Sequence, residues 1–191
     1  MSNSGKKMKI SFNSPVILGF TLICLAALIL NFFTGGLANL LFFSVYRSPM
    51  FAPLSYFRLI GHVFGHANWS HFIGNITLIL VVGPLLEEKY GSKKMMLVIF
   101  VTAIVTGLAN IILFPHIRLL GASGVVFALI LLASFASIQQ GEIPLTFILV
   151  AILYIGGEII DGIFVQDNIS HLTHILGGGV GASLGFKLNR K

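Results

Sequence analysis

The amino-acid sequence predicts an all-α membrane protein with six transmembrane helices, and three observations lead to this fold class. Of the 191 residues, 56% are hydrophobic and only 9% are charged, whereas an ordinary soluble domain carries roughly 25% charged residues. Apolar segments near the ~17–25 residues that span a bilayer recur along the chain. Polar side chains of the kinds that do chemistry gather at one end of every second segment.

The six expected spans cover about residues 15–33, 70–86, 95–114, 122–138, 143–160 and 170–187. The fifth is the weakest, because Gly156, Gly157, Glu158 and Asp161 interrupt its end. The first follows a group of lysines, as a signal peptide would, but its apolar run is long for one and five more spans follow. We therefore expect a retained first helix.

The first connection differs from the others, which are short. Residues 34–69 mix Phe, Tyr, Leu, Gly and Pro, so they are too apolar for a free linker and too interrupted for a span. We expect a long first outer loop of short helices at the interface or tucked into the protein. The predicted organisation is a membrane domain at 15–187 between a short cytoplasmic segment, 1–14, and a cytoplasmic tail, 188–191.

Orientation follows from the positions of lysine and arginine, which favour the cytoplasmic side. With the N-terminus inside, the inner segments hold nine of these residues: Lys6, Lys7, Lys9, Lys89, Lys93, Lys94, Lys187, Arg190 and Lys191. The outer segments hold only Arg47, Arg58 and Arg118. Both termini are therefore predicted to be cytoplasmic. The net charge of +6 is explained by topology, and no nucleic-acid partner is expected.

Four polar side chains fall in the first turns of the second, fourth and sixth spans, which all enter from the outer face. They are His71, Asn75, Ser123 and His174. The rise of about 1.5 Å per residue places all four in the outer half of the bilayer, where a pocket can hold the water that hydrolysis needs. Helix N-termini there also favour a developing oxyanion. The odd-numbered spans offer no comparable set.

The sixth span carries His174, Gly177 and Gly181 on one helical face. Small residues at this spacing let two helices approach closely, so the fourth span as neighbour would bring His174 within reach of Ser123. A serine hydroxyl needs such a base to act as a nucleophile. No acid is placed to orient His174, so a Ser–His dyad is favoured. His71, Asn75 and the backbone N–H of Ser123 are candidate oxyanion donors.

These residues resemble the motifs of the rhomboid intramembrane serine proteases. The matching fragments are 121-GASG-124, 66-HANWSHFIGN-75, and His174 with its glycines. Phe57 and Arg58 resemble the family's aromatic–arginine pair in the first loop, and Glu87 fits its glutamate at the inner end of the second helix. Phe57 stands where Trp is more usual, and Phe127 where many bacterial relatives have Tyr.

The resemblance implies a six-helix rhomboid-like bundle around a shorter fourth helix, with a pocket open to the outside. It implies that Ser123 and His174 cleave transmembrane protein substrates near their outer ends, and that the fifth helix or its adjoining loop gates access. It also suggests a bacterial plasma membrane. The expected partners are these substrates and the lipid bilayer, with no cofactor or metal. The natural substrate, the cleavage site and the oligomeric state stay open.

Each of these residues could also have a purely structural role. Ser123 could be helix-packing filler, and His71 and Asn75 could only cross-link helices. His66 and Arg58 are expected to be structural, tying or anchoring the first loop, and Glu87 to form hydrogen bonds at the cytoplasmic helix end.

Three rival functions remain. A transporter is disfavoured because no internal repeat is visible, and a zinc protease because no HExxH pattern occurs. A rhomboid relative that binds membrane proteins without cleaving them is less favoured, because both Ser123 and His174 are present.

Overall fold

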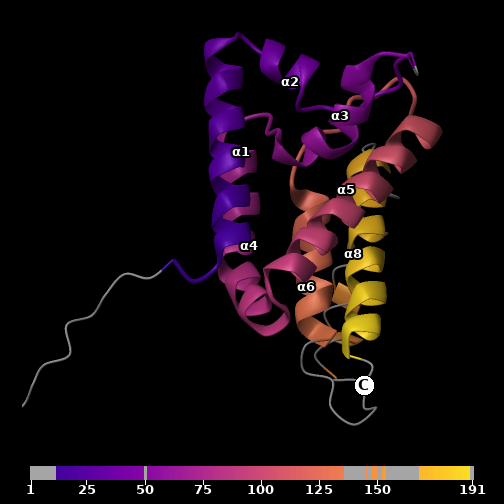
Figure 1. Ribbon diagram of the computed structural model, residues 1–191. Coiled ribbons are helices and arrows are strands. Elements are labelled where there is room, and N and C mark those ends of the chain that lie inside the picture. Colours follow the sequence, from indigo (N-terminus) through magenta and orange to yellow (C-terminus); the bar gives the residue numbers. More distant parts are fainter. Residues whose placement is uncertain are drawn as a thin grey trace, which may run out of the picture.

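The computed structural model describes residues 12–49, 51–135 and 168–189, together with residues 145, 148–149 and 152–153. Its helices are α1 (Pro15–Phe33), α2 (Leu37–Leu41), α3 (Pro53–Gly61), the short 3₁₀ helix η1 (His62–Phe64), α4 (Trp69–Tyr90), α5 (Ser92–Leu113), α6 (Ser123–Phe135) and α8 (Asn168–Asn189). The one β pairing in these residues is an isolated bridge between Val45 and Leu119. Figure 1 shows the long helices packed as a bundle.

The all-helical prediction holds over the described residues. Three of their helices, α1, α4 and α5, are long and apolar enough to cross a membrane, and α6 is a shorter apolar helix. The fifth predicted span, 143–160, lies almost wholly outside the described residues, so the count of six spans stays a prediction. The same holds for the division at residues 14 and 187, because residues 1–11 and 190–191 are also outside.

Local sequence explains where the long helices begin and end. Pro15 opens α1, at a position where its missing N–H costs nothing. Asn68 caps α4, because its side chain accepts a hydrogen bond from the backbone N–H of His71 at 2.9 Å. Gly91, with φ +83°, separates α4 from α5 and allows an abrupt reversal of the chain.

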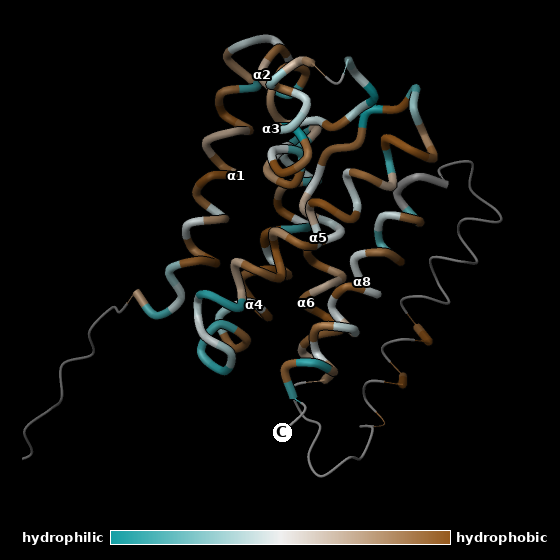
Figure 2. Tube along the Cα trace, turned by 45° about the vertical axis from the view of Figure 1, so that its right-hand side comes forward, coloured by the Kyte–Doolittle hydropathy of each residue, from teal (hydrophilic) through white to brown (hydrophobic). Residues whose placement is uncertain are grey.

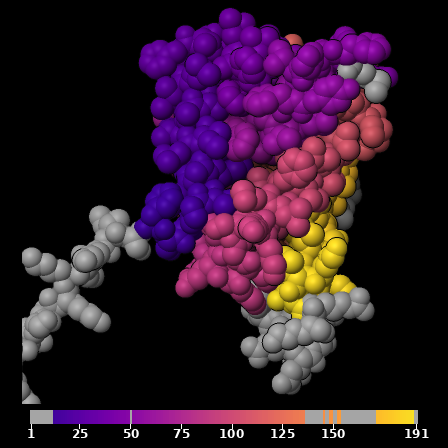
Figure 3. All heavy atoms as spheres, in the orientation of Figure 1, coloured from indigo at the N-terminus to yellow at the C-terminus, as the bar shows by residue number. Residues whose placement is uncertain are grey.

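The segment between α1 and α4 contains α2, α3 and η1 and lies across one end of the bundle. In Figure 3 its atoms form a continuous layer from α1 to α5. Figure 2 shows hydrophilic residues in this layer and at the opposite end, where α4 meets α5. Between these ends the helices are largely hydrophobic, as expected for elements that cross a bilayer.

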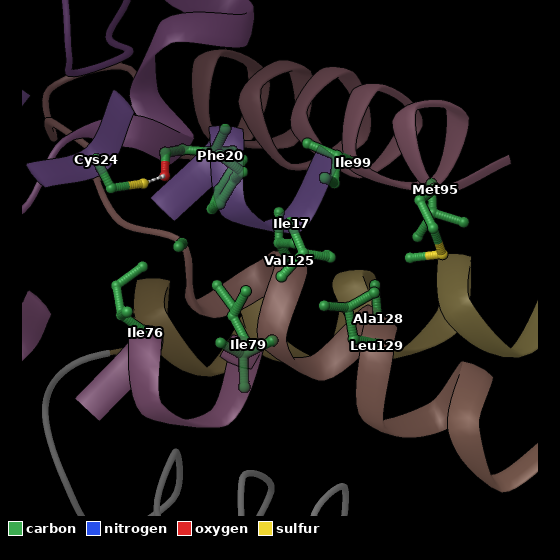
Figure 4. Close-up of a cluster of buried hydrophobic side chains, with 14 of the residues drawn as sticks. Ile17, Phe20, Cys24, Ile76, Ile79, Met95, Ile99, Val125, Ala128 and Leu129 are labelled. Atoms are coloured by element: carbon green, nitrogen blue, oxygen red, sulfur yellow. Dashed lines mark hydrogen bonds between the residues drawn. The ribbon is translucent and has the colours of Figure 1, made fainter. Parts of the chain in front are cut away.

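The core is formed where α1, α4, α5 and α6 meet. Side chains from these four helices point toward one another in Figure 4, including Ile17, Ile79, Met95 and Val125. All four are almost completely buried. The participation of Ile17 and Cys24 makes α1 an integral part of the bundle, which agrees with a retained first helix.

The lower end of the bundle is joined by hydrogen bonds between distant residues. Glu87, at the end of α4, accepts hydrogen bonds from the backbone N–H groups of Val16 and Ile17, both at 3.0 Å. Asn189, the last residue of α8, donates to the Tyr90 hydroxyl at 2.8 Å. The start of α1 and the end of α8 therefore lie at the same end as the α4–α5 connection (Figure 1).

Candidate active site

Ser123 is the first residue of α6, and the turn before it is held from two sides. The backbone N–H of Gly121 donates to the carbonyl oxygen of His62 at 2.9 Å. Just upstream, Leu119 pairs with Val45 through two backbone hydrogen bonds. Gly121 has φ +132°, a conformation that L side chains rarely adopt. Backbone hydrogen bonds therefore fix the turn before Ser123 to the segment between α1 and α4.

Helix α8 packs directly on α6 through glycines. A Cβ on Gly177 would overlap the carbonyl oxygen of Gly124, and one on Gly181 would overlap that of Ala128. The absence of side chains there lets the two backbones touch, which is the close approach expected of small residues at this spacing. Gly124 directly follows Ser123, so the contact begins at the candidate nucleophile.

His174 lies at the same corner as the start of α6. Its ring stacks on Phe127, with centroids 4.3 Å apart and planes within 7° of parallel. Its chain neighbour Thr173 also lies close to Gly124. Phe127 lies one helical turn after Ser123, so these contacts place the His174 ring against the first turns of α6. Figure 1 shows α6 and α8 side by side along their length.

His71 borders this corner from the first turn of α4. Its Cε1 and Nε2 atoms would lie 2.8 Å and 3.0 Å from a Cβ built on Gly121, and Ser123 Oγ lies 4.0 Å from the same point. Gly121 is thus a close-approach position, where any side chain would collide with the His71 ring. The structure places His71 next to the Ser123 turn.

Asn75 lies one turn along α4 from His71 and is 8% exposed. Its amide nitrogen, Nδ2, is buried and has no hydrogen-bond partner among the described residues. Most buried polar groups are hydrogen-bonded, so an unsatisfied donor calls for an explanation. The oxygen of a bound ligand would be a suitable acceptor.

Two histidines of the segment between α1 and α4, His62 and His66, contact residues of the site. His66 is fully buried, its ring meets that of His71 edge to face at 5.2 Å, and its carbonyl oxygen accepts from Asn39 Nδ2 at 3.0 Å. His62 Nε2 lies 3.2 Å from the Thr106 hydroxyl oxygen. Burial lowers the pKa of each to about 4, with a further contribution from nearby His71 for His66. Both are therefore neutral at pH 7.

The remaining predicted structural residues occupy two separate places. The Arg58 guanidinium donates to the Tyr46 hydroxyl at 2.7 Å and to Ser48 Oγ at 3.0 Å, within the segment between α1 and α4. Glu87, at the far end of the bundle, also accepts from Ser92 Oγ at 2.7 Å. The structural roles expected of Arg58 and Glu87 stay predictions.

The sequence analysis missed a polar row on α5. Thr102, Thr106 and Asn110 are all buried at spacings of one turn, so the expectation that odd-numbered spans lack a comparable polar set was wrong. Asn110 Nδ2 donates to the carbonyl oxygens of Val45 and Ile117, at 3.1 and 3.0 Å. This row supports the loop and the Ser123 turn, and its spacing in an apolar span was a readable signal.

Comparisons with known proteins identify the family of the chain. The profile of the family described as "Rhomboid domain" matches residues 53–191. The chain is 32% identical over 140 residues to Rhomboid-related protein 1 of Caenorhabditis elegans, covering 68% of this chain and 39% of that protein.

Two further relatives are a protozoan and a bacterial protein. The chain is 34% identical over 83 residues to Rhomboid-like protease 3 of Toxoplasma gondii, covering 44% of this chain and 32% of the relative. It is 29% identical over 116 residues to Rhomboid protease GlpG of Yersinia pestis, covering 60% and 41%. The matches thus span about a third to two fifths of the length of these three relatives.

Proposed function

The chain belongs to the rhomboid family, and from this premise we propose that it is an intramembrane serine endopeptidase with a Ser123–His174 dyad. It hydrolyses peptide bonds in or near the transmembrane segments of membrane-protein substrates, close to the extracytoplasmic face. The observation that carries the proposal is the contact between α6 and α8. Gly177 packs against Gly124, the residue after Ser123, and the His174 ring stacks on Phe127, one turn farther along α6; both contacts support the proposed dyad.

The reaction begins when His174 accepts the hydroxyl proton of Ser123. The Ser123 oxygen then attacks the carbonyl carbon of the scissile peptide bond, and the carbonyl oxygen becomes an oxyanion. His174 returns its proton to the leaving amine nitrogen as the C–N bond breaks, leaving an ester on Ser123. A water molecule, deprotonated by His174, hydrolyses the ester and restores the free serine.

The oxyanion is stabilised by donors that surround the Ser123 turn. Asn75 Nδ2 is a buried donor, and the His71 ring lies beside Gly121. Ser123 is the first residue of α6, and its backbone N–H is the third donor. Donors of this kind act strongly because they are fixed before the charge develops.

The planar stack of Phe127 on His174 fixes the orientation of the base. The His174 ring is held by its stack on the face of Phe127. A carboxylate is therefore not needed to orient the base. The two-residue arrangement is therefore sufficient for the proposed chemistry.

The decisive experiment is cleavage of a single-span reporter protein in liposomes by the wild type and by Ser123→Ala. The rate with Ser123→Ala, and with His174→Ala, should fall by roughly a thousandfold or more, because each removes a group that the chemical step requires. Ser134→Ala is a matched control on the same helix, since the Ser134 hydroxyl donates to the Ile130 carbonyl oxygen within its own helix. It should cleave as the wild type does.

A serine-directed fluorophosphonate provides an independent test. It should label the detergent-purified wild type and not Ser123→Ala. Equal labelling of both proteins would contradict the assignment of Ser123. A wild type that is neither labelled nor able to cleave any reporter would favour a family member that binds membrane proteins over one that cleaves them.

A further inference from the structure

Arg58 is a buried cation whose described partners are all neutral. The residue is 5% exposed, and its guanidinium bonds the hydroxyl groups of Tyr46, Ser48 and Ser55. Its Nε atom is buried and has no hydrogen-bond partner in the part of the chain that the structure describes. A buried charge without a counter-charge costs several kcal/mol, so this position calls for an anion.

The described part of the chain does not supply that anion. Its carboxylate side chains belong to Glu87 and Glu88, and Glu87 is engaged with α1 and Ser92 at the other end of the bundle.

A second arginine shares the aromatic ring on which Arg58 lies. The guanidinium carbon of Arg58 is 4.3 Å from the centroid of the Tyr46 ring, and that of Arg118 is 5.5 Å from the same centroid. The bridge between Val45 and Leu119 sets this register, because Tyr46 and Arg118 are the adjoining residues. The ring stabilises each cation in part, but the two positive charges repel each other.

Two of the three arginines predicted on the outer side, Arg58 and Arg118, therefore lie against the same ring. Arg118 and Arg47 are exposed, and Arg47 directly follows Tyr46 in the chain. An anion bound to the exposed guanidinium of Arg118, beside the Tyr46 ring, would relieve the repulsion and partly offset the buried charge of Arg58. A planar guanidinium group suits a phosphate, because it can donate two parallel hydrogen bonds to two of the phosphate oxygens.

We propose that Arg58, Tyr46 and Arg118 frame a binding site for the phosphate of an anionic phospholipid headgroup. The neighbouring helix α3 favours a lipid over a free phosphate ion. Its residues Leu54 and Phe57 are exposed by 39% and 49%, and nearby Phe51 is almost fully exposed. These apolar side chains offer a surface for acyl chains beside the cationic corner.

The test measures lipid binding by the delipidated, detergent-purified protein, so it does not depend on proteolysis. Short-chain phosphatidylglycerol, phosphatidylcholine with the same acyl chains, and inorganic phosphate at matched ionic strength are titrated while the melting temperature is recorded. Phosphatidylglycerol should raise the melting temperature in a saturable way, and the other two should do so only weakly.

Two variants make the assignment specific. Arg118→Gln should raise the apparent Kd for phosphatidylglycerol about tenfold, the effect of losing one charge-assisted hydrogen bond. Lys94→Gln is the matched control, because Lys94 is an exposed cation near the opposite end of the bundle, and it should bind as the wild type does. Arg118 is exposed, so its variant should fold even if a change at the buried Arg58 does not.

Three results would overturn the proposal. Equal affinity of the wild type and Arg118→Gln would remove the site from this corner. Equal affinity for phosphatidylcholine would show that the negative charge is not recognised. Saturation by inorganic phosphate at the same concentration as the lipid would assign the corner to a free phosphate ion.

Discussion

At the scale of single residues, Asn75 carries a donor that the folded chain leaves unused. The buried Nδ2 atom has no partner among the described residues, and a donor in that state lowers stability unless something else compensates. The proposed oxyanion would provide the missing acceptor during the reaction. Asn75 would then contribute to the transition state more than to the bound ground state.

We therefore expect Asn75→Ala to lower kcat by roughly 10²–10³ with little change in KM, the pattern of a lost oxyanion donor. The measurement is the steady-state kinetics of reporter cleavage in liposomes, with the melting temperature recorded to confirm folding. A raised KM with kcat intact would mean that Asn75 binds the substrate instead. Unchanged kinetics would confine it to a structural role.

His62 and His66 make stability depend on pH in a defined window. Burial lowers the pKa of both from 6.5 to about 4. At pH above 6.5 neither state of the chain is protonated at these residues, and their contribution is complete. As pH falls below 6.5 the unfolded chain gains protons that the folded chain does not, so stability decreases down to about pH 4 and then levels off.

The predicted loss is on the order of 3 kcal/mol for His62 over this window. It can be measured as the melting temperature of the detergent-purified protein from pH 8 to pH 4. A His62→Gln variant should lose part of the pH dependence, whereas His116→Gln, which alters an exposed histidine, should retain it. An identical pH profile for all three proteins would contradict the burial argument.

At the scale of elements, the contact between α6 and α8 decides whether the dyad can form. Gly177 has no room for a methyl group, because the backbone carbonyl of Gly124 occupies that space. Backbone atoms cannot rotate aside as a side chain can, so a larger residue must push the two helices apart.

Gly177→Ala should therefore reduce cleavage by at least roughly tenfold and cost about 1–3 kcal/mol of stability, the usual range for overpacking. Gly179→Ala is a control on the same helix, because a Cβ there would have no neighbour within 4 Å. It should leave cleavage unchanged and stabilise the helix slightly. Equal activity of the two variants would mean that α8 can shift without loss of function.

At the scale of the whole molecule, Glu87 joins the end of α4 to the start of α1. Its carboxylate accepts the N–H groups of Val16 and Ile17 and so caps α1 from a residue about 70 positions away in the chain. The positive end of the α1 dipole favours a negative charge at this place. Without Glu87 these N–H groups would be left without their acceptor.

We expect Glu87→Ala to lower stability by about 2–4 kcal/mol, since several donors lose one acceptor together. Glu88→Ala is the matched control, because Glu88 is exposed, and it should change stability by less than about 0.5 kcal/mol. Thermal unfolding of both variants in the same detergent gives the comparison. Similar melting temperatures would show that α1 does not depend on this cap.

Much of the fold class and the set of candidate residues could be predicted from the chain alone. The apolar segments at 15–33, 70–86 and 95–114 correspond to α1, α4 and α5, and the resemblance to rhomboid proteases is confirmed by the family match. Composition and span length follow from the bilayer, which acts on each segment separately. Such properties are local, so they can be read along the sequence.

Only the tertiary structure decided which distant residues meet. The hydrogen bond of Asn110 to Val45, the close approach of His71 to Gly121, and the position of Arg118 over the Tyr46 ring join segments that are far apart in the chain. These contacts arise because each helix can rotate and shift until its neighbours fill the space around it. Ser123 and His174 could thus be named as candidates from the sequence, whereas any contact between them depends on the packing of the whole bundle.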